Sequence, residues 1–171
     1  MRAAVGGDVE CFVALCHRYY ATLVAVARAV LRDGHLAEDA AQEALAVACQ
    51  RLSTLKEPRR FGAWLVTICR HEANAIRRRR PRVERLGERD VPAAPHSDPA
   101  DETAAVRQAV DSLPVESREL LYLRYRNELS YEAIANLLGL TVEAVHGRLR
   151  RAKRDVKIHL ERERNQDRRS L

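Results

Sequence analysis

Residues 141–156 read TVEAVHGRLRRAKRDV and carry side chains suited to contacting a polyanion. Apolar residues recur there at steps of three and four, which predicts a helix with one buried face. They are Val142, Val145, Leu149, Ala152 and Val156. The remaining positions include His146, Gly147 and five basic residues between 148 and 154. Cations on an exposed helix face can neutralise phosphates, and arginine can also bind the edge of guanine.

A glycine inside this helix costs roughly 1 kcal/mol relative to alanine. We expect Gly147 to let the backbone approach DNA closely, with His146 and Arg148 near base edges or phosphates. Arg151, Lys153 and Arg154 would supply countercharge. The alternative is a solvated basic helix in which the glycine is merely tolerated.

The residues before this helix favour DNA binding. Ser130 is a good N-cap for a short helix, Gly139 can end that helix in the left-handed conformation, and Thr141 can cap the next. Two helices joined by a tight glycine turn predict a helix-turn-helix, whose second helix enters the major groove.

A second cationic segment lies at residues 77–80, at the end of a predicted helix that also contains Phe61, Trp64 and His71. Aromatic rings beside cations can stack on unpaired bases. Two alternatives stay open: Trp64 is a core residue, and the arginines are a solvated helix end favoured by the helix dipole.

Metal-dependent catalysis is not expected, and neither a catalytic residue nor a cofactor is predicted. Cys69 and His71 are two positions apart, which points them to different helix faces, and HExxH is absent because position 75 is alanine.

Without a CxxC pair or a signal peptide, the four cysteines are interpreted as core thiols of a cytoplasmic protein, with a redox switch left open. They are Cys11, Cys16, Cys49 and Cys69. No apolar stretch is long enough to span a membrane.

The elements that must position these residues are helices nearly throughout, so we predict an all-α protein with two small helical domains. The first covers residues 1–80, with RDGH at 32–35 separating two helices and KEPRR at 56–60 preceding a third. A flexible, proline-containing linker at 81–102 leads to the helix-turn-helix domain at 103–160, and the tail at 161–171 is expected to be disordered. The net charge of +6 favours a polyanionic partner.

Three stretches together resemble the extracytoplasmic-function (ECF) group of bacterial RNA polymerase sigma factors, in the sigma-70 family. They are LAEDAAQEAL, FGAWLVTICRHEANAIRRR and the segment from LPVESRELL to HGRLRRAK. The resemblance implies a non-enzymatic subunit that binds core RNA polymerase, recognises the −10 and −35 elements of promoter DNA and promotes strand opening. It also implies a regulatory partner such as an anti-sigma factor.

The resemblance assigns candidate residues to three surfaces. The polymerase-binding residues would be Glu38, Asp39, Gln42 and Glu43, although acids early in a helix are also favoured by the dipole alone. The −10 DNA-binding residues would be Trp64, Arg70, His71, Asn74, Arg77, Arg78 and Arg79. The −35 DNA-binding residues would be Thr141, Glu143, His146, Gly147, Arg148, Arg150, Arg151 and Lys153.

The chain departs from the family's common residues at His71, Ala75, His146 and Gly147, which leaves the promoter sequence open. A neutral histidine at 146 would bind DNA more weakly than a lysine. The competing hypothesis is a self-standing helix-turn-helix regulator, a dimer that binds a two-fold symmetric operator without polymerase.

Overall fold

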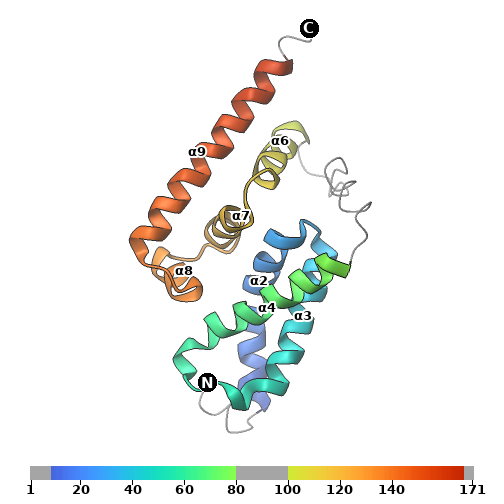
Figure 1. Cartoon of the computed structure of the whole chain (residues 1–171), viewed down its shortest axis with the longest axis vertical. Helices are drawn as coiled ribbons and strands as arrows, with labels where there is room; N and C mark the ends of the chain where they lie inside the picture. Colours follow the sequence, from blue (N-terminus) through green and yellow to red (C-terminus); the bar gives the residue numbers. More distant parts are fainter. Residues whose placement is uncertain (1–8, 80–99, 168–171) are drawn as a thin grey trace.

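A computed structural model describes residues 9–79 and 100–167, and every regular element in these ranges is a helix (Figure 1). The predicted all-α class is confirmed. The first module, residues 9–79, contains α2 (Val9–Leu31), α3 (Gly34–Arg51) and α4 (Phe61–Arg79). The second module, residues 100–167, contains α6 (Ala100–Asp111), α7 (Val115–Leu121), α8 (Tyr131–Leu138) and α9 (Val142–Asp167). Residues 81–99 of the expected linker lie outside the described residues, and α6 begins at its end.

The break between α2 and α3 falls where the RDGH stretch predicts it, but glycine does not make the turn. Arg32 adopts the left-handed conformation, with φ 59°, and its amide donates to the carbonyl of Arg28 at 2.9 Å. Asp33 then caps α3, because its carboxylate accepts a hydrogen bond from the Leu36 amide at 3.1 Å. The chain can therefore reverse within two residues and lay α3 against α2.

Helix α3 packs through small side chains. Its buried residues are Ala37, Ala40, Ala41, Ala44 and Ala48. Alanine lets two helix backbones approach closely, and α3 contacts both α2 and α4 through this face. The opposite face of α3 is left in solvent.

Helix α4 begins after two short 3-10 turns, η1 (Leu52–Thr54) and η2 (Pro58–Arg60). Phe61 is 2% exposed and packs edge-on against Tyr19, with ring centroids 5.5 Å apart. Next to it, a Cβ added to Gly62 would lie 2.9 Å from the Tyr19 ring and 3.3 Å from a methyl carbon of Leu137. The absence of a side chain at position 62 lets α4 contact α2 and the second module together.

The two modules pack directly on each other. Helix α7 continues into a π-helical turn, η3 (Tyr122–Arg126), and both contact α2, while α8 contacts α4. One continuous apolar cluster includes Leu23 and Leu65 of the first module and Leu120 and Ile134 of the second. The sequence predicts two helical domains joined by a linker, and the structure shows in addition that the two share one apolar core.

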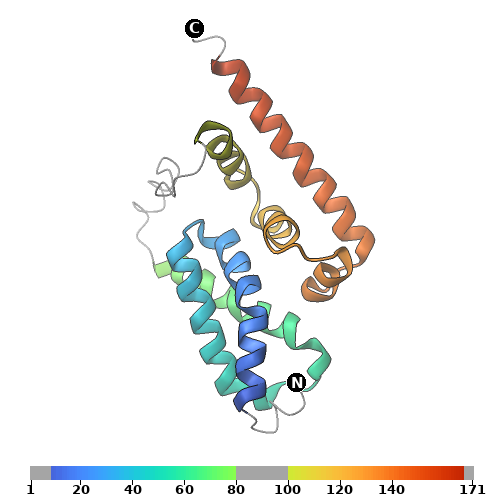
Figure 2. The ribbon, with the colours of Figure 1, turned by 180° about the vertical axis from the view of Figure 1, so that it is seen from behind.

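Helix α9 is longer than expected. The sequence predicts a disordered tail from residue 161, but the helix continues to Asp167. Glutamate and arginine are good helix formers, and Lys157 pairs with Glu161 one turn later at 3.8 Å. Figures 1 and 2 show the C-terminal end of α9 extending past the other helices.

No helix within residues 9–79 and 100–167 combines the length and the apolar character that crossing a bilayer requires.

Candidate nucleic-acid interface

The helix-turn-helix has the caps that the sequence predicts. The Ser130 hydroxyl accepts a hydrogen bond from the Ala133 amide at 3.1 Å and starts α8. Gly139 ends α8 with φ 67°, and Leu140 then donates its amide to the Ala135 carbonyl at 2.9 Å. The Thr141 hydroxyl accepts from the Ala144 amide at 3.1 Å and starts α9. The turn therefore fixes α9 as the second helix of the motif.

The predicted buried face of α9 is largely confirmed. Val145, Leu149 and Ala152 are at most 2% exposed, and Val142 and Val156 are half-buried. The polar −35 candidates are all in solvent: Thr141, Glu143, His146, Arg148, Arg150, Arg151 and Lys153.

The −35 candidates divide into two surfaces. Glu143, His146, Gly147 and Arg150 line one hollow together with Val142. A Cβ added at Gly147 would meet nothing within 4 Å, so no contact inside the described chain calls for glycine there. Arg148 instead lines a cavity between the modules. The structure thus brings four of the candidates together and separates Arg148 from them.

His146 contacts an aromatic ring, that of Tyr131, which the sequence pattern does not indicate as a neighbour. Its imidazole stacks on Tyr131 of α8, with centroids 4.1 Å apart and planes 8° from parallel. The Arg124 guanidinium lies 5.2 Å from the centre of the same tyrosine ring. Lys153 similarly lies 5.9 Å from the Tyr125 ring. Tyr131 is the first residue of α8, at the end far from the turn into α9, so the local pattern does not indicate its contact with His146.

The −10 candidates on α4 are in different environments. Trp64 is half-buried, and its ring centroid lies 5.9 Å from that of Phe61. It therefore contributes to the core while keeping part of its ring in solvent. His71 is exposed, as are Arg77, Arg78 and Arg79. An exposed arginine cluster at a helix C-terminus provides positive charge for a phosphate backbone.

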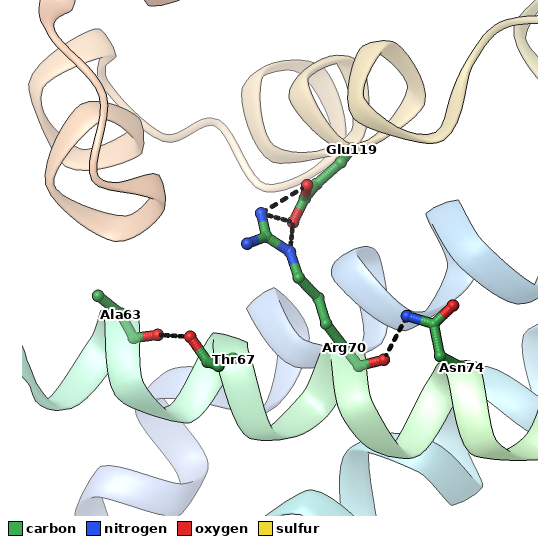
Figure 3. A network of polar contacts seen from close by, with 5 residues as sticks. All are labelled: Ala63, Thr67, Arg70, Asn74 and Glu119. Atoms are coloured by element: carbon green, nitrogen blue, oxygen red, sulfur yellow. Dashed lines mark hydrogen bonds and ion pairs between the residues drawn. The ribbon is translucent and has the colours of Figure 1, made fainter.

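Arg70 and Asn74, the other two −10 candidates, have partners within the protein (Figure 3). The Asn74 amide donates to the Arg70 carbonyl at 2.8 Å. The Arg70 guanidinium donates to both carboxylate oxygens of Glu119 in α7. Its Nη2 atom lies 2.8 Å from each of them. Burial raises the pKa of Glu119, while its hydrogen bonds from Arg70 act in the opposite direction.

The four polymerase-binding candidates lie on the solvent face of α3, opposite its buried alanines. They are Glu38, Asp39, Gln42 and Glu43. Their spacing places three carboxylates and an amide on one exposed helix face. This acidic patch contrasts with the arginine cluster at the end of α4 and with the basic exposed face of α9.

The described residues contain no group of three or more His, Cys, Asp or Glu side chains arranged to hold a metal ion. Cys69 is buried, and burial raises the pKa of its thiol to about 12.

Comparison with known protein families gives two matches. The family described as Sigma-70 region 2 matches residues 15–82, and Sigma-70, region 4 matches residues 103–156. These matches cover most of α2, all of α3 and α4, and the helix-turn-helix of the second module.

Curated relatives carry corresponding names. The probable RNA polymerase sigma factor RfaY of Xanthomonas campestris pv. campestris is 37% identical over 150 residues, which are 81% of this chain and 38% of RfaY. The ECF RNA polymerase sigma factor EcfG of Rhodopseudomonas palustris is 30% identical over 121 residues, 68% of this chain and 67% of EcfG.

Two solved structures are similar to the described fold. CnrH, in complex with the cytosolic domain of CnrY, is 26% identical with a TM-score of 0.64, covering 94% of both chains. The sigma factor RpoE of Bartonella quintana, in complex with the anti-sigma factor NepR, is 24% identical with a TM-score of 0.63, covering 90% of this chain and 98% of RpoE. The RpoE comparison supports the fold alone.

Proposed function

The chain belongs to the ECF group of sigma-70 family RNA polymerase sigma factors, and from this membership we propose how its surfaces act at a promoter. The observation that carries the proposal is the capped helix-turn-helix with an exposed basic second helix, following a module that matches region 2. Its partners are core RNA polymerase and promoter DNA. The protein supplies binding specificity in transcription initiation, and no catalytic step is assigned to it.

The first surface is the acidic patch of α3, which would bind core polymerase through Glu38, Asp39, Gln42 and Glu43. These side chains are exposed, and the alanine packing behind them fixes the helix that carries them. A rigid helix face loses little conformational freedom on association, which favours binding.

The second surface is α4 with the residues before it, which would hold the −10 element as single-stranded DNA. Trp64, Arg70, His71 and Asn74 would contact bases, and Arg77, Arg78 and Arg79 would contact phosphates. Base stacking on aromatic side chains is worth about 1–3 kcal/mol per base, which can offset the stacking lost on strand opening. Binding energy alone would drive strand opening.

The third surface is the exposed face of α9, which would enter the major groove at the −35 element. Glu143, His146, Gly147 and Arg150 would lie toward the bases, with Thr141, Arg148, Arg151 and Lys153 around them. Glycine at 147 has no contact to explain it within the described chain, and close approach of DNA supplies a reason for it. Arginine donates to guanine, and glutamate accepts from cytosine.

A regulatory protein partner such as an anti-sigma factor is also part of the proposal. The similarity to CnrH, solved with the cytosolic domain of CnrY, supports it. The site of action would be the cytoplasm, where RNA polymerase transcribes.

Run-off transcription tests the function. Bacterial core polymerase is mixed with the purified protein and fragments of the source genome, and the RNA start sites are mapped. Discrete starts that require the protein are expected, preceded by two shared sequence elements. The absence of such starts, together with a dimer that binds a symmetric operator on its own, would favour the self-standing regulator instead.

A further inference from the structure

The ion pair between Arg70 and Glu119 joins a proposed DNA-binding side chain to the other module. The guanidinium Nη2 lies 2.8 Å from both carboxylate oxygens, and Nε lies 3.2 Å from one of them. The Glu119 side chain is 5% exposed and that of Arg70 is 38% exposed. Two acceptor atoms facing two nitrogens of arginine is also how the guanine edge, with its O6 and N7, binds arginine. Glu119 thus occupies the face of Arg70 that DNA would use (Figure 3).

The same region brings the two DNA surfaces against one cavity. Arg70, Asn74 and Arg77 of α4 line it from one side, and Arg148 of α9 from another. Its volume of about 410 Å³ is that of a small-molecule pocket. In this arrangement, Glu119 holds Arg70 at the same cavity that Arg148 lines.

We propose that Glu119 is a built-in competitor of DNA for Arg70, and that its ion pair helps to hold the protein in a closed, self-inhibited arrangement. The proposal rests on the function above, because it takes Arg70 as a DNA contact. DNA or polymerase binding must separate α7 from α4, after which Arg70 is available to the promoter strand.

The energetics allow the pair to act as a reversible latch. Within the described residues, Arg70 is the hydrogen-bonding partner of Glu119, so losing it while Glu119 stays buried would leave an uncompensated charge. If the modules separate, water can solvate both groups, and that penalty is avoided. The apparent DNA affinity then equals the intrinsic affinity multiplied by the fraction of open molecules.

The test compares Glu119→Gln with Glu116→Gln in the full chain. Glu116 is exposed on the same helix and lines the same cavity, but it makes no ion pair with Arg70. The two variants change the net charge equally. Binding to a short fluorescent single-stranded oligonucleotide of random sequence is measured by anisotropy, and the radius of gyration by small-angle X-ray scattering.

We expect Glu119→Gln to bind the oligonucleotide about three- to tenfold more tightly than Glu116→Gln, as the open fraction rises. Its radius of gyration should also be larger. Equal affinities in the two folded variants would overturn the proposal. A larger radius with unchanged affinity would overturn it too, because the contact would then be a structural joint without competition.

Glu119→Asp keeps the charge but shortens the side chain, so it weakens the bidentate contact even if Glu119→Gln does not fold. It should also bind the oligonucleotide more tightly than the wild type, and an unchanged affinity would contradict the proposal. These measurements need no polymerase. A failure of run-off transcription would therefore count against the proposed function, and equal oligonucleotide affinities against the latch.

Discussion

The guanidinium group of Arg118 donates two hydrogen bonds to the main-chain carbonyl oxygen of Ala29, 89 positions earlier in the sequence. The same group donates to the carbonyls of Asp111 and Leu113, at 3.1 and 2.6 Å. Ala29 lies in the last turn of α2, Asp111 is the last residue of α6, and Leu113 lies in the turn that follows α6. One buried cation therefore satisfies carbonyl groups at the C-terminal ends of two helices from different modules.

Replacing Arg118 with methionine should lower the free energy of unfolding by about 2–5 kcal/mol, because buried carbonyl groups lose their donors. Urea unfolding followed by circular dichroism measures the change. Arg126→Met is the control, since Arg126 is exposed and should change stability by less than about 0.5 kcal/mol. Equal stabilities for the two variants would show that the buried guanidinium contributes no net stabilisation.

Two of the helical glycines, Gly62 and Gly147, should respond in opposite ways to alanine. Gly62→Ala should destabilise the protein by about 1–3 kcal/mol, because its Cβ meets the Tyr19 ring at 2.9 Å. Gly147→Ala should stabilise it by about 0.5–1 kcal/mol, because its Cβ meets nothing and alanine favours the helix. The same Gly147 variant should bind the −35 duplex more weakly in an anisotropy titration. Unchanged DNA binding would contradict the proposal that Gly147 lets DNA approach the α9 backbone closely.

Arg148→Ala should weaken binding to the −35 element about equally for different sequences and reduce the salt slope by about 1, because a phosphate contact is lost. Its association with core polymerase, measured by gel filtration, should not change. Arg162→Ala removes an exposed arginine far along the same helix and serves as the charge control. Loss of polymerase association in folded Arg148→Ala would contradict the assignment.

The double variant Asp39→Ala, Gln42→Ala should show the reverse pattern. Core polymerase binding should fall, because two exposed polar groups of the α3 patch are removed, while −35 duplex binding is retained. Competition against the wild-type protein for a limiting amount of core polymerase gives the relative affinity. Gln50→Ala, exposed on the same helix, is the matched control and should compete like the wild type.

The cysteines should differ in their rates of alkylation. Cys49 is exposed and should react with iodoacetamide first at pH 8. Cys16 is half-buried and should follow, because burial and the neighbouring Cys49 raise its pKa. Cys69 has a pKa of about 12, which leaves roughly one thiol in ten thousand ionised at pH 8.

Raising the pH increases the thiolate fraction, but Cys69 should stay unmodified until the protein unfolds, since its thiol also donates to the Leu23 carbonyl at 3.4 Å. Peptide mass mapping over time, with and without urea, measures the order. Early modification of Cys69 in the folded protein would contradict the described burial.

The helices and the DNA-binding motif could be predicted because their signals are local. The caps at Ser130 and Thr141 and the left-handed Gly139 each depend on a few neighbouring residues, and all three are confirmed. The exposed positions on α3 and α9 likewise follow from helical periodicity.

The contacts between modules could not be predicted in this way. The Arg70–Glu119 pair joins residues 49 positions apart, and nothing in either local pattern marks them as partners. Arg118 and Glu119 are charged residues that a periodicity reading places in solvent, yet both are at most 4% exposed. Their burial depends on how α7 packs on α2 and α4, which is a property of the assembled fold.

The alanine face of α3 also has a thermodynamic consequence. Alanine has no side-chain rotamers, so its burial costs no side-chain conformational entropy, whereas a buried methionine or glutamine would lose up to about 2 kcal/mol. Five such residues on one helix make its packing depend largely on close approach of the helix backbones. A larger side chain at any of these positions would push α3 away from α2 and α4, so mutational tolerance should differ sharply between the two faces of this helix.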